Sequence, residues 1–525
     1  MHDLIIVGAG TAGCVLAERL SRSGRRRVLL IEAGGNPSSQ FVGIPAGFAK
    51  LFKSELDWNF ESEPQGHADG RKIFVPRGKM LGGSSNINAQ IHQWCHPADY
   101  EEWVAAGAQG WGWEEVAPIF RAQENWLGED PDGSRGQDGP MIISPNKNVH
   151  AMTSAFVAAA RAAGLGNQPR YNGDAYEGVW YTELAHQDGK RFSVYDAYLK
   201  PALNRSNLEV LRDGQVTRIN FENGRAAGVT VRREGVEQSY AAGGVVLAAG
   251  AFGSPQLLMH SGIGPAEMLT NLGIPLYYDA PEVGANLQDH PMTAVIYRTR
   301  GNDTFKNAES PLSLLKYLIF KRGMLASNAV EAMAFAPVHG GPGTPPDIEL
   351  IFAPFEWRNQ GLEPPQIHAF SFGAAVIAPK SRGSMKLRSA NPLDPPVIDF
   401  GLLSDPEGLD AKAMLAAVRL ARKIAATPPL AGFAAEEFFP GAALESDAEL
   451  RSRLHTALQT VYHPTSTCRM GSDPRAVVDP QLRVNGVQGL WVADASVMPA
   501  VPRGHPNAVV AMLAYRAAEM IEKNS

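Results

Sequence analysis

Two short apolar runs near the N-terminus flank a segment with helical spacing. Leu4–Val7 and Val28–Ile31 are continuous aliphatic runs, the pattern of parallel strands that are buried on both faces. Between them, Ala12, Leu16 and Leu20 recur at intervals of about one helical turn. The pattern therefore predicts a strand, a turn, a helix and a second strand.

The predicted turn carries glycines at a spacing that suits a bound phosphate. Gly8, Gly10 and Gly13 form a G-x-G-x-x-G pattern. In this pattern the first glycine permits a tight turn, the second lets the backbone approach a pyrophosphate, and the third lets the helix pack on the strand. Glu32 follows the second strand, where a carboxylate can accept hydrogen bonds from both hydroxyls of an adenosine ribose. These features predict a Rossmann-like domain that binds an adenine dinucleotide, without separating FAD from NAD.

The remainder of the chain contains two kinds of segment, which differ in composition and in predicted secondary structure. Short alternating strands with an ENGR turn precede a buried strand at 244–249, and a strand at 490–493 ends in Asp494. Residues 301–455 are richer in proline and contain amphipathic stretches. We therefore expect an α/β protein, α+β overall. Its discontinuous nucleotide-binding domain would cover 1–155, 195–300 and 456–525, with an inserted mixed-sheet substrate-binding domain over 156–194 and 301–455.

Composition and charge exclude several classes of protein. At 525 residues the chain exceeds what one hydrophobic core usually supports. Its net charge of -6 does not match the positive charge expected of a protein that binds nucleic acid. Cys14, Cys95 and Cys468 form no CxxC pair, so we expect neither a disulfide framework nor a metal site. No apolar stretch approaches the ~20 residues of a transmembrane helix. The stretch LLKYLIF at 314–320 is short, and we expect a buried helix there.

Seven motifs along the chain carry a resemblance to one family. They are VGAGTAGCVLAERLS, PRGKMLGGSSNIN, HPADYEEW, LAAGAFGSPQLLMHSGIGP, VGANLQDHP, YHPTSTCRMG and LWVADASVMP with NAVVAMLAYRAAEMI. In combination they resemble the glucose–methanol–choline (GMC) oxidoreductases, FAD enzymes that oxidise alcohols. The resemblance extends to the choline-dehydrogenase-like and aliphatic alcohol dehydrogenase branch. It implies FAD as the cofactor and a small alcohol as the substrate.

The resemblance also implies which residues surround the flavin. The implied cofactor-binding residues are Gly8, Gly10, Gly13, Glu32, Gly83, Asn88, Val216, Asp494, Asn507 and Ala508. The family's catalytic pair matches His463 in YHPTST and His505 in GHPNA. Ile87 occupies the position of the histidine that attaches FAD covalently in some members, so we expect non-covalent FAD. Pro506 suits the first turn of a helix, whose positive end would stabilise negative charge on a reduced flavin.

The other histidines are interpreted separately, because four histidines precede a proline and the dipeptide identifies nothing by itself. His96 opens a predicted helix in HPADYEEW, which is a structural role. We expect His290 in LQDHP to end a loop, with a position near the cofactor as the alternative. The role of His92 in the atypical segment QIHQWC stays open. Trp94 in the same segment could narrow the substrate pocket or pack in the core.

These inferences lead to a specific reaction. We expect oxidation of a primary alcohol to the aldehyde, with hydride transfer to flavin N5 and a histidine as general base. We favour His463 as the base and His505 as the group that orients the hydroxyl, with the reverse assignment as the alternative. The rivals are a hydroxynitrile lyase, a fatty-acid photodecarboxylase and a non-catalytic flavoprotein.

Several properties of the enzyme stay open at this stage. The electron acceptor is O2 or a quinone or other carrier, and no residue separates an oxidase from a dehydrogenase. The chain starts with a strand and not with a secretory signal, so we expect a cytoplasmic protein. A peripheral position at the inner membrane and a homodimer are further possibilities.

Overall fold

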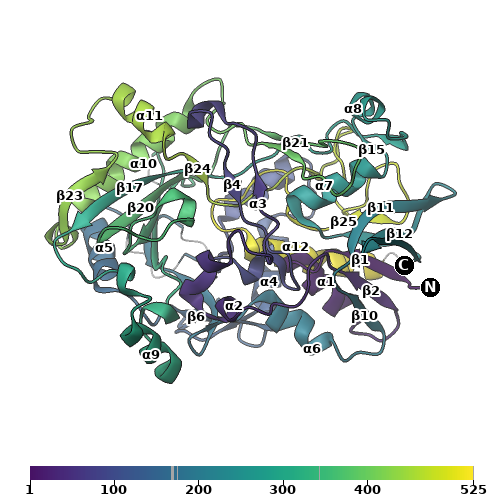
Figure 1. Cartoon of the computed structure of the whole chain (residues 1–525), viewed down its shortest axis with the longest axis horizontal. Helices are drawn as coiled ribbons and strands as arrows, with labels where there is room; N and C mark the ends of the chain where they lie inside the picture. The colour runs from purple at the N-terminus through teal and green to yellow at the C-terminus, as the bar shows by residue number, and fades with distance from the viewer. Residues whose placement is uncertain (167–170, 174–175, 342, 524–525) are drawn as a thin grey trace.

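The computed structural model describes residues 1–166, 171–173, 176–341 and 343–523. Figure 1 shows a small parallel sheet beside the chain termini at the right and a larger antiparallel sheet at the left. Helices pack against both sheets. The mixture of parallel and antiparallel sheets with helices confirms the expected fold class.

The parallel sheet is assembled from segments that are far apart in the sequence. In spatial order its described strands are β10 (Leu208–Leu211), β2 (Val28–Ile31), β1 (Leu4–Val7), β14 (Val245–Leu247) and β25 (Leu490–Val492). All neighbouring strands run parallel. The central strands β1 and β2 are buried at every residue, which explains their continuous apolar runs.

Two helices that pack against each other begin next to this sheet. Helix α1 (Thr11–Ser21) joins β1 to β2, so the predicted strand–turn–helix–strand unit is confirmed. Helix α12 (Asn507–Lys523) packs against α1 and begins directly after Pro506. The chain thus brings its first and last helices together (Figure 1).

The antiparallel sheet forms the other half of the molecule. Its described strands, in spatial order, are β23 (Ala434–Phe439), β17 (Pro291–Thr299), β20 (Ala369–Val376), β19 (Ile348–Ala353), β18 (Ala332–Ala336) and β7 (Gly178–Tyr181), with β24 (Gln459–Thr460) beside β17. Helix α10 (Leu409–Ala425) packs across β17, β19 and β20, and α5 (Ala151–Ala162) packs against β7. Strand β17 lies within the predicted range 195–300, and residues 167–170 and 174–175 of the range 156–194 lie outside the described residues. The domain boundaries therefore stay a prediction.

Smaller elements complete the fold. A three-stranded sheet contains β11 (Gln215–Glu222), β12 (Arg225–Arg233) and β13 (Val236–Ala241), and the ENGR turn joins the first two, with Asn223 and Gly224 both at positive φ. The other strands are β3 (Phe60–Glu61), β4 (Phe74–Val75), β5 (Glu124–Trp126), β6 (Met141–Pro145), β8 (Glu183–Gln187), β9 (Lys190–Arg191), β15 (Ile263–Gly264), β16 (Tyr278–Asp279), β21 (Ser384–Lys386) and β22 (Val397–Asp399). The other helices are α2 (Gln40–Gly43), α3 (Pro97–Ala105), α4 (Trp113–Gln123), α6 (Lys200–Ala202), α7 (Gly250–His260), α8 (Ala266–Asn271), α9 (Pro311–Phe320) and α11 (Asp447–His455).

Helix α9 contradicts one expectation from the sequence. The apolar stretch at 314–320 does form a helix, but the expected burial is wrong, because Tyr317 is its one buried residue. Hydrophobicity alone does not reveal whether a partner surface exists for such a stretch. Among the described residues, no helix has the length and apolar character needed to cross a bilayer.

Candidate active site

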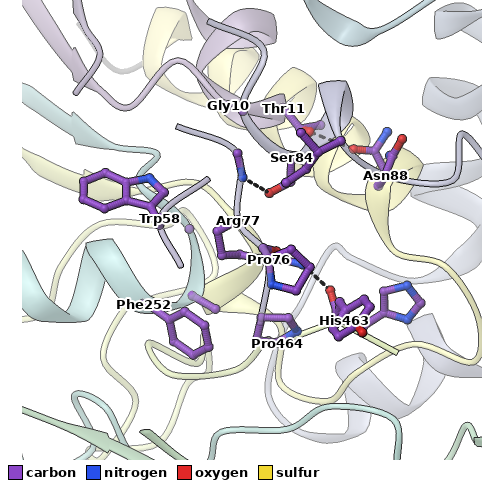
Figure 2. A pocket seen from close by; sticks show the side chains of 18 of the residues that line it. Gly10, Thr11, Trp58, Pro76, Arg77, Ser84, Asn88, Phe252, His463 and Pro464 are labelled. Atoms are coloured by element: carbon purple, nitrogen blue, oxygen red, sulfur yellow. Dashed lines mark hydrogen bonds between the residues drawn. The ribbon is translucent and has the colours of Figure 1, made fainter. Parts of the chain in front are cut away.

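One deep cavity takes its lining from both large sheets. Most of the predicted site residues line it: Gly8, Gly10, Glu32, Gly83, Asn88, Val216, His463, Asp494, His505 and Asn507. Gly13 and Ala508 are buried beside the cavity and are not part of its lining. Figure 2 shows Gly10, Thr11 and Asn88 at one end of the view and His463 at the other.

The glycines at the start of α1 form a cradle that has no space for side chains. Gly8 has φ +97°, and a Cβ at Gly13 would lie 1.8 Å from the carbonyl oxygen of Gly8. A Cβ at Gly83 would lie 2.6 Å from the Cα of Gly10, so two glycine loops touch. No side chain caps the N-terminus of α1 at Gly10. A helix N-terminus left uncapped beside such loops can receive a pyrophosphate, so the residues present fit a dinucleotide.

Glu32 occupies the position expected of a ribose-binding acid. Its carboxylate accepts the backbone N–H groups of Ala9 at 2.8 Å and Gly34 at 2.9 Å. Burial raises the pKa of Glu32 to about 7, against the opposing effect of these N–H groups. The backbone therefore holds the carboxyl group in place at the end of β2, within the cavity lining.

Asp494 and Asn507 tie the C-terminal part of the chain to the cradle. The carboxylate of Asp494 accepts the backbone N–H of Gly250 at 2.8 Å, at the start of α7. The hydroxyl of Thr11 donates to Oδ1 of Asn507 at 2.7 Å, which joins the N-termini of α1 and α12. Both helix N-termini consequently face one cavity.

Three histidines meet at the other end of the cavity. The rings of His463 and His505 are 4.8 Å apart between centroids and nearly perpendicular. Nδ1 of His463 lies 3.0 Å from Nδ1 of His290, and Nε2 of His505 lies 3.0 Å from a carboxylate oxygen of Glu349. Glu349, His505, His463 and His290 thus form a continuous row. Among the described residues, no group of three or more His, Cys, Asp or Glu has a geometry suited to a metal ion.

Backbone hydrogen bonds fix the positions of these histidines. One oxygen of Asp289 accepts the backbone N–H groups of both His290 and His463, each at 2.8 Å. The side-chain oxygen of Gln93 accepts the backbone N–H of His505 at 2.8 Å. Each catalytic candidate is therefore held by a buried polar side chain from a distant segment.

The surroundings favour neutral imidazoles. Burial, and then the nearby His505, His290 and Arg77, hold the pKa of His463 well below its usual value. Burial and the nearby His505 lower the pKa of His290 to about 3, against the opposing effect of the backbone carbonyls of Pro502 and Ile377. A neutral imidazole that lines a cavity can accept a proton, so His463 is suited to general base chemistry.

Comparisons with known proteins agree with this arrangement. The two sequence models of the GMC oxidoreductase family match residues 2–292 and 379–514. An uncharacterized GMC-type oxidoreductase of Mycobacterium tuberculosis is 44% identical over 99% of each chain. An alcohol dehydrogenase (acceptor) of Pseudomonas putida is 38% identical over 99% of this chain and 96% of that one. The crystal structure of pyridoxine 4-oxidase from Mesorbium loti has a TM-score of 0.90 at 32% identity, over 99% of each chain.

This chain belongs to the GMC oxidoreductase family. Members of the family are FAD-dependent and act on CH–OH donors, so the predicted family, enzyme class and cofactor are confirmed. The glycine cradle and the row of histidines are accordingly two ends of one flavoenzyme site.

Two side chains of the segment before α3, His92 and Trp94, have packing roles in this GMC oxidoreductase. Nε2 of His92 lies 3.2 Å from the indole nitrogen of Trp94, and neither side chain lines the cavity. Trp94 stacks on Phe120 with centroids 5.6 Å apart, so it packs in the core and does not narrow the pocket. The imidazole of His96 caps α3 by accepting the backbone N–H of Ala98 at 3.0 Å, which confirms its structural role.

One buried acid of the site, Glu349, was not identified from the sequence. His290 ends a loop directly before β17, as expected, and it also contacts His463 at the histidine end of the cavity, in line with the alternative expectation. Glu349 lies in β19 within an otherwise apolar run, IELIFA, and is fully buried. The sequence signal that could have identified Glu349 is a single acid within an apolar strand. A buried carboxylate needs a hydrogen-bonding or charged partner, so such an acid points to a polar contact in the folded protein.

An apolar cluster forms part of the cavity wall, beside polar lining residues that include Arg77, Ser371 and Thr460. Its side chains pack as one cluster and come from the segment after Gly83, from the antiparallel sheet and from the strand before His463. The cluster members that line the cavity are Ala89, Ile91, Met292, Val330, Ile351, Trp357 and Val461.

Proposed function

We propose that this GMC oxidoreductase oxidises an apolar primary alcohol to the aldehyde, with His463 as the general base. The observation that carries the proposal is the convergence of His463 and His505, whose rings lie 4.8 Å apart in the cavity lining. A hydroxyl beside these rings can give its proton to the free nitrogen of His463, while the perpendicular ring of His505 limits where the hydroxyl lies.

The chain's residues would hold the cofactor without a covalent bond. Gly8, Gly10 and Gly83 would surround the pyrophosphate, and Glu32 would accept the ribose hydroxyls. Ile87, which lines the cavity, offers no nucleophile for attachment. Bound FAD would accept the hydride from the carbinol carbon.

Nε2 of His463 is the proton acceptor in this proposal. Nδ1 of His463 lies 3.0 Å from Nδ1 of His290, so one of these two nitrogens carries a proton that the other accepts. In the tautomer with this proton on His463, Nε2 of His463 keeps its lone pair for the substrate. A positioned base of this kind contributes about 10²–10⁴-fold to the rate.

His505 would act by orientation. Its Nε2–H donates to Glu349, which fixes the plane of the ring beside His463. Glu349 is not part of the cavity lining, so its carboxylate does not contact a substrate there. With the apolar wall around Met292 and Ile351, this favours an uncharged aliphatic or aromatic alcohol. The name of the Pseudomonas putida relative supports an alcohol as the substrate.

The test is a panel of primary alcohols mixed anaerobically with the purified yellow protein, followed by admission of air. Bleaching of the flavin by apolar alcohols, with the matching aldehyde as product, is the expected result. Rapid recolouring in air would identify an oxidase, and slow recolouring a dehydrogenase that needs a quinone or another carrier. A flavin that no alcohol bleaches would refute the proposal. Alkane formation from a long-chain acid under illumination would then identify a photodecarboxylase.

A further inference from the structure

Helix α9 presents an unusual concentration of apolar side chains to solvent. Six of the sixteen large apolar side chains exposed in the described part of the chain lie on this ten-residue helix. They are Leu312 (76% exposed), Leu314, Leu315, Leu318, Ile319 and Phe320 (65%). Scattered exposed apolar residues are normal in globular proteins, whereas a contiguous group of this kind marks an interaction surface.

The helix is held at a defined place in the fold. Ser310 caps its N-terminus by accepting the backbone N–H of Ser313, and Tyr317 is buried beneath it. The helix lies against the turn Met324–Ala326, which in turn packs on the segment Pro45–Leu51. Figure 1 shows α9 protruding at the lower left, away from both sheets. The apolar side chains are therefore displayed on a folded helix that is capped and anchored at one residue.

Charge identifies the kind of partner. Lys316, Lys321 and Arg322 lie on or directly after the helix, within a chain whose net charge is -6. The acid closest in sequence, Glu309, is paired with Lys50 at 2.7 Å. Apolar side chains with adjacent basic residues on a short helix match an anionic lipid surface, where the apolar side chains enter the acyl region and the cations meet the headgroups.

We propose that α9 docks this protein peripherally on a bilayer that contains anionic lipids. The helix lies parallel to the surface, with Leu315 and Ile319 on the side opposite the buried Tyr317 and Leu318 on its flank. The segment Pro45–Leu51, on which the supporting turn packs, contributes Phe48 to the wall of the cavity. Docking therefore places the bilayer next to the part of the fold that encloses the cavity. The inference does not depend on the proposed reaction.

The test is co-sedimentation of the FAD-loaded enzyme with vesicles of phosphatidylcholine, alone or mixed with phosphatidylglycerol. We expect binding to the mixed vesicles and weaker binding to phosphatidylcholine alone. The variant L315S/L318S/I319S should bind at least about 10-fold more weakly, because burial of one such side chain already exceeds this factor. The variant K316Q/R322Q should lose about fivefold per removed charge on the mixed vesicles.

A matched control replaces exposed apolar residues elsewhere. V236S/L276S changes side chains that are 68% and 48% exposed and lie outside α9, and it should bind as the wild type does. Flavin content and melting temperature would show that each variant is folded. Absence of binding by the wild type, or undiminished binding by the α9 triple variant, would overturn the proposal. A wild-type dimer that the triple variant converts to monomers, without lipid binding, would show that a second copy covers the helix.

Discussion

Replacement of Glu349 by glutamine isolates the contribution of one buried hydrogen bond to the site. Oε1 of Glu349 lies 3.0 Å from Nε2 of His505, the carboxylate is fully buried, and His505 is 9% exposed. A hydrogen bond to a charged group contributes about 1.5–3 kcal/mol. Glutamine keeps an acceptor oxygen but loses the charge, which weakens the bond by about 1–1.5 kcal/mol. If this bond holds His505 during the reaction, flavin reduction slows by roughly 5- to 13-fold, since about 1.4 kcal/mol is a factor of ten.

The control for this variant is a second buried glutamate. Glu331 is also fully buried and accepts hydrogen bonds from Thr153 at 2.6 Å and Ser327 at 2.7 Å, but it does not line the cavity. Glu331→Gln should therefore lower the melting temperature and leave the rate of flavin reduction close to that of the wild type. Glu349→Gln should retain FAD and reduce it slowly.

Anaerobic stopped-flow measurement of flavin bleaching by a saturating alcohol separates these outcomes, because it reports the reductive step alone. Wild-type rates in Glu349→Gln would refute the reasoning. Equal slowing in both variants would also refute it, since the effect would then belong to the loss of any buried carboxylate.

Two further predictions concern the supports of the histidines. Burial raises the pKa of Asp289 from 3.8 to about 7, so the folded protein keeps a proton that the unfolded chain releases, and stability falls as pH rises from about 4 to 7. Asp289→Asn should remove this part of the pH dependence, as measured by thermal unfolding at several pH values. Gly504→Ala should slow flavin reduction about 10²-fold, because its Cβ would lie 2.3 Å from the Gln93 oxygen that holds His505. Gly441→Ala, also at positive φ but with open space around it, should leave the rate unchanged.

Each of these two predictions has a separate outcome that would contradict it. A wild-type and an Asp289→Asn protein with parallel stability curves between pH 4 and 7 would show that Asp289 does not titrate in this range. A Gly504→Ala enzyme as fast as Gly441→Ala would show that the Gln93 contact does not position the histidine.

The phosphate cradle could be predicted from the sequence because its information is local. Gly8, Gly10 and Gly13 lie within six residues; contacts with near neighbours require Gly8 and Gly13, and Gly10 lies against the second loop, where a Cβ at Gly83 would lie 2.6 Å from its Cα. The apolar runs on either side place the turn at the end of a buried strand. Spacing and strand pattern therefore determine this half of the site.

The histidine end depends on contacts across long stretches of sequence. Glu349 and His505 are separated by 156 residues, and His290 and His463 by 173. The dipeptide that begins with His290 also occurs at His96, which caps a helix. No local pattern distinguishes the two, because the difference arises when the antiparallel sheet brings β17 and β19 beside the C-terminal loops.

The exposure of α9 could not be predicted for a related reason. An apolar run predicts burial only when the fold supplies a surface to cover it. Here the fold covers Tyr317 and leaves its neighbours in solvent. A sequence pattern records the hydrophobicity of a segment and not the position of its partner, which lies outside the chain in our proposal.

The central claim is that His463 takes the hydroxyl proton while His505 orients the substrate. Its most direct test is the anaerobic rate of flavin bleaching by one apolar primary alcohol in the wild type, His463→Ala and His505→Ala, each loaded with FAD. We predict a loss of about 10²–10⁴-fold in His463→Ala and a smaller loss in His505→Ala. Near-normal rates of flavin reduction in both variants would contradict the account.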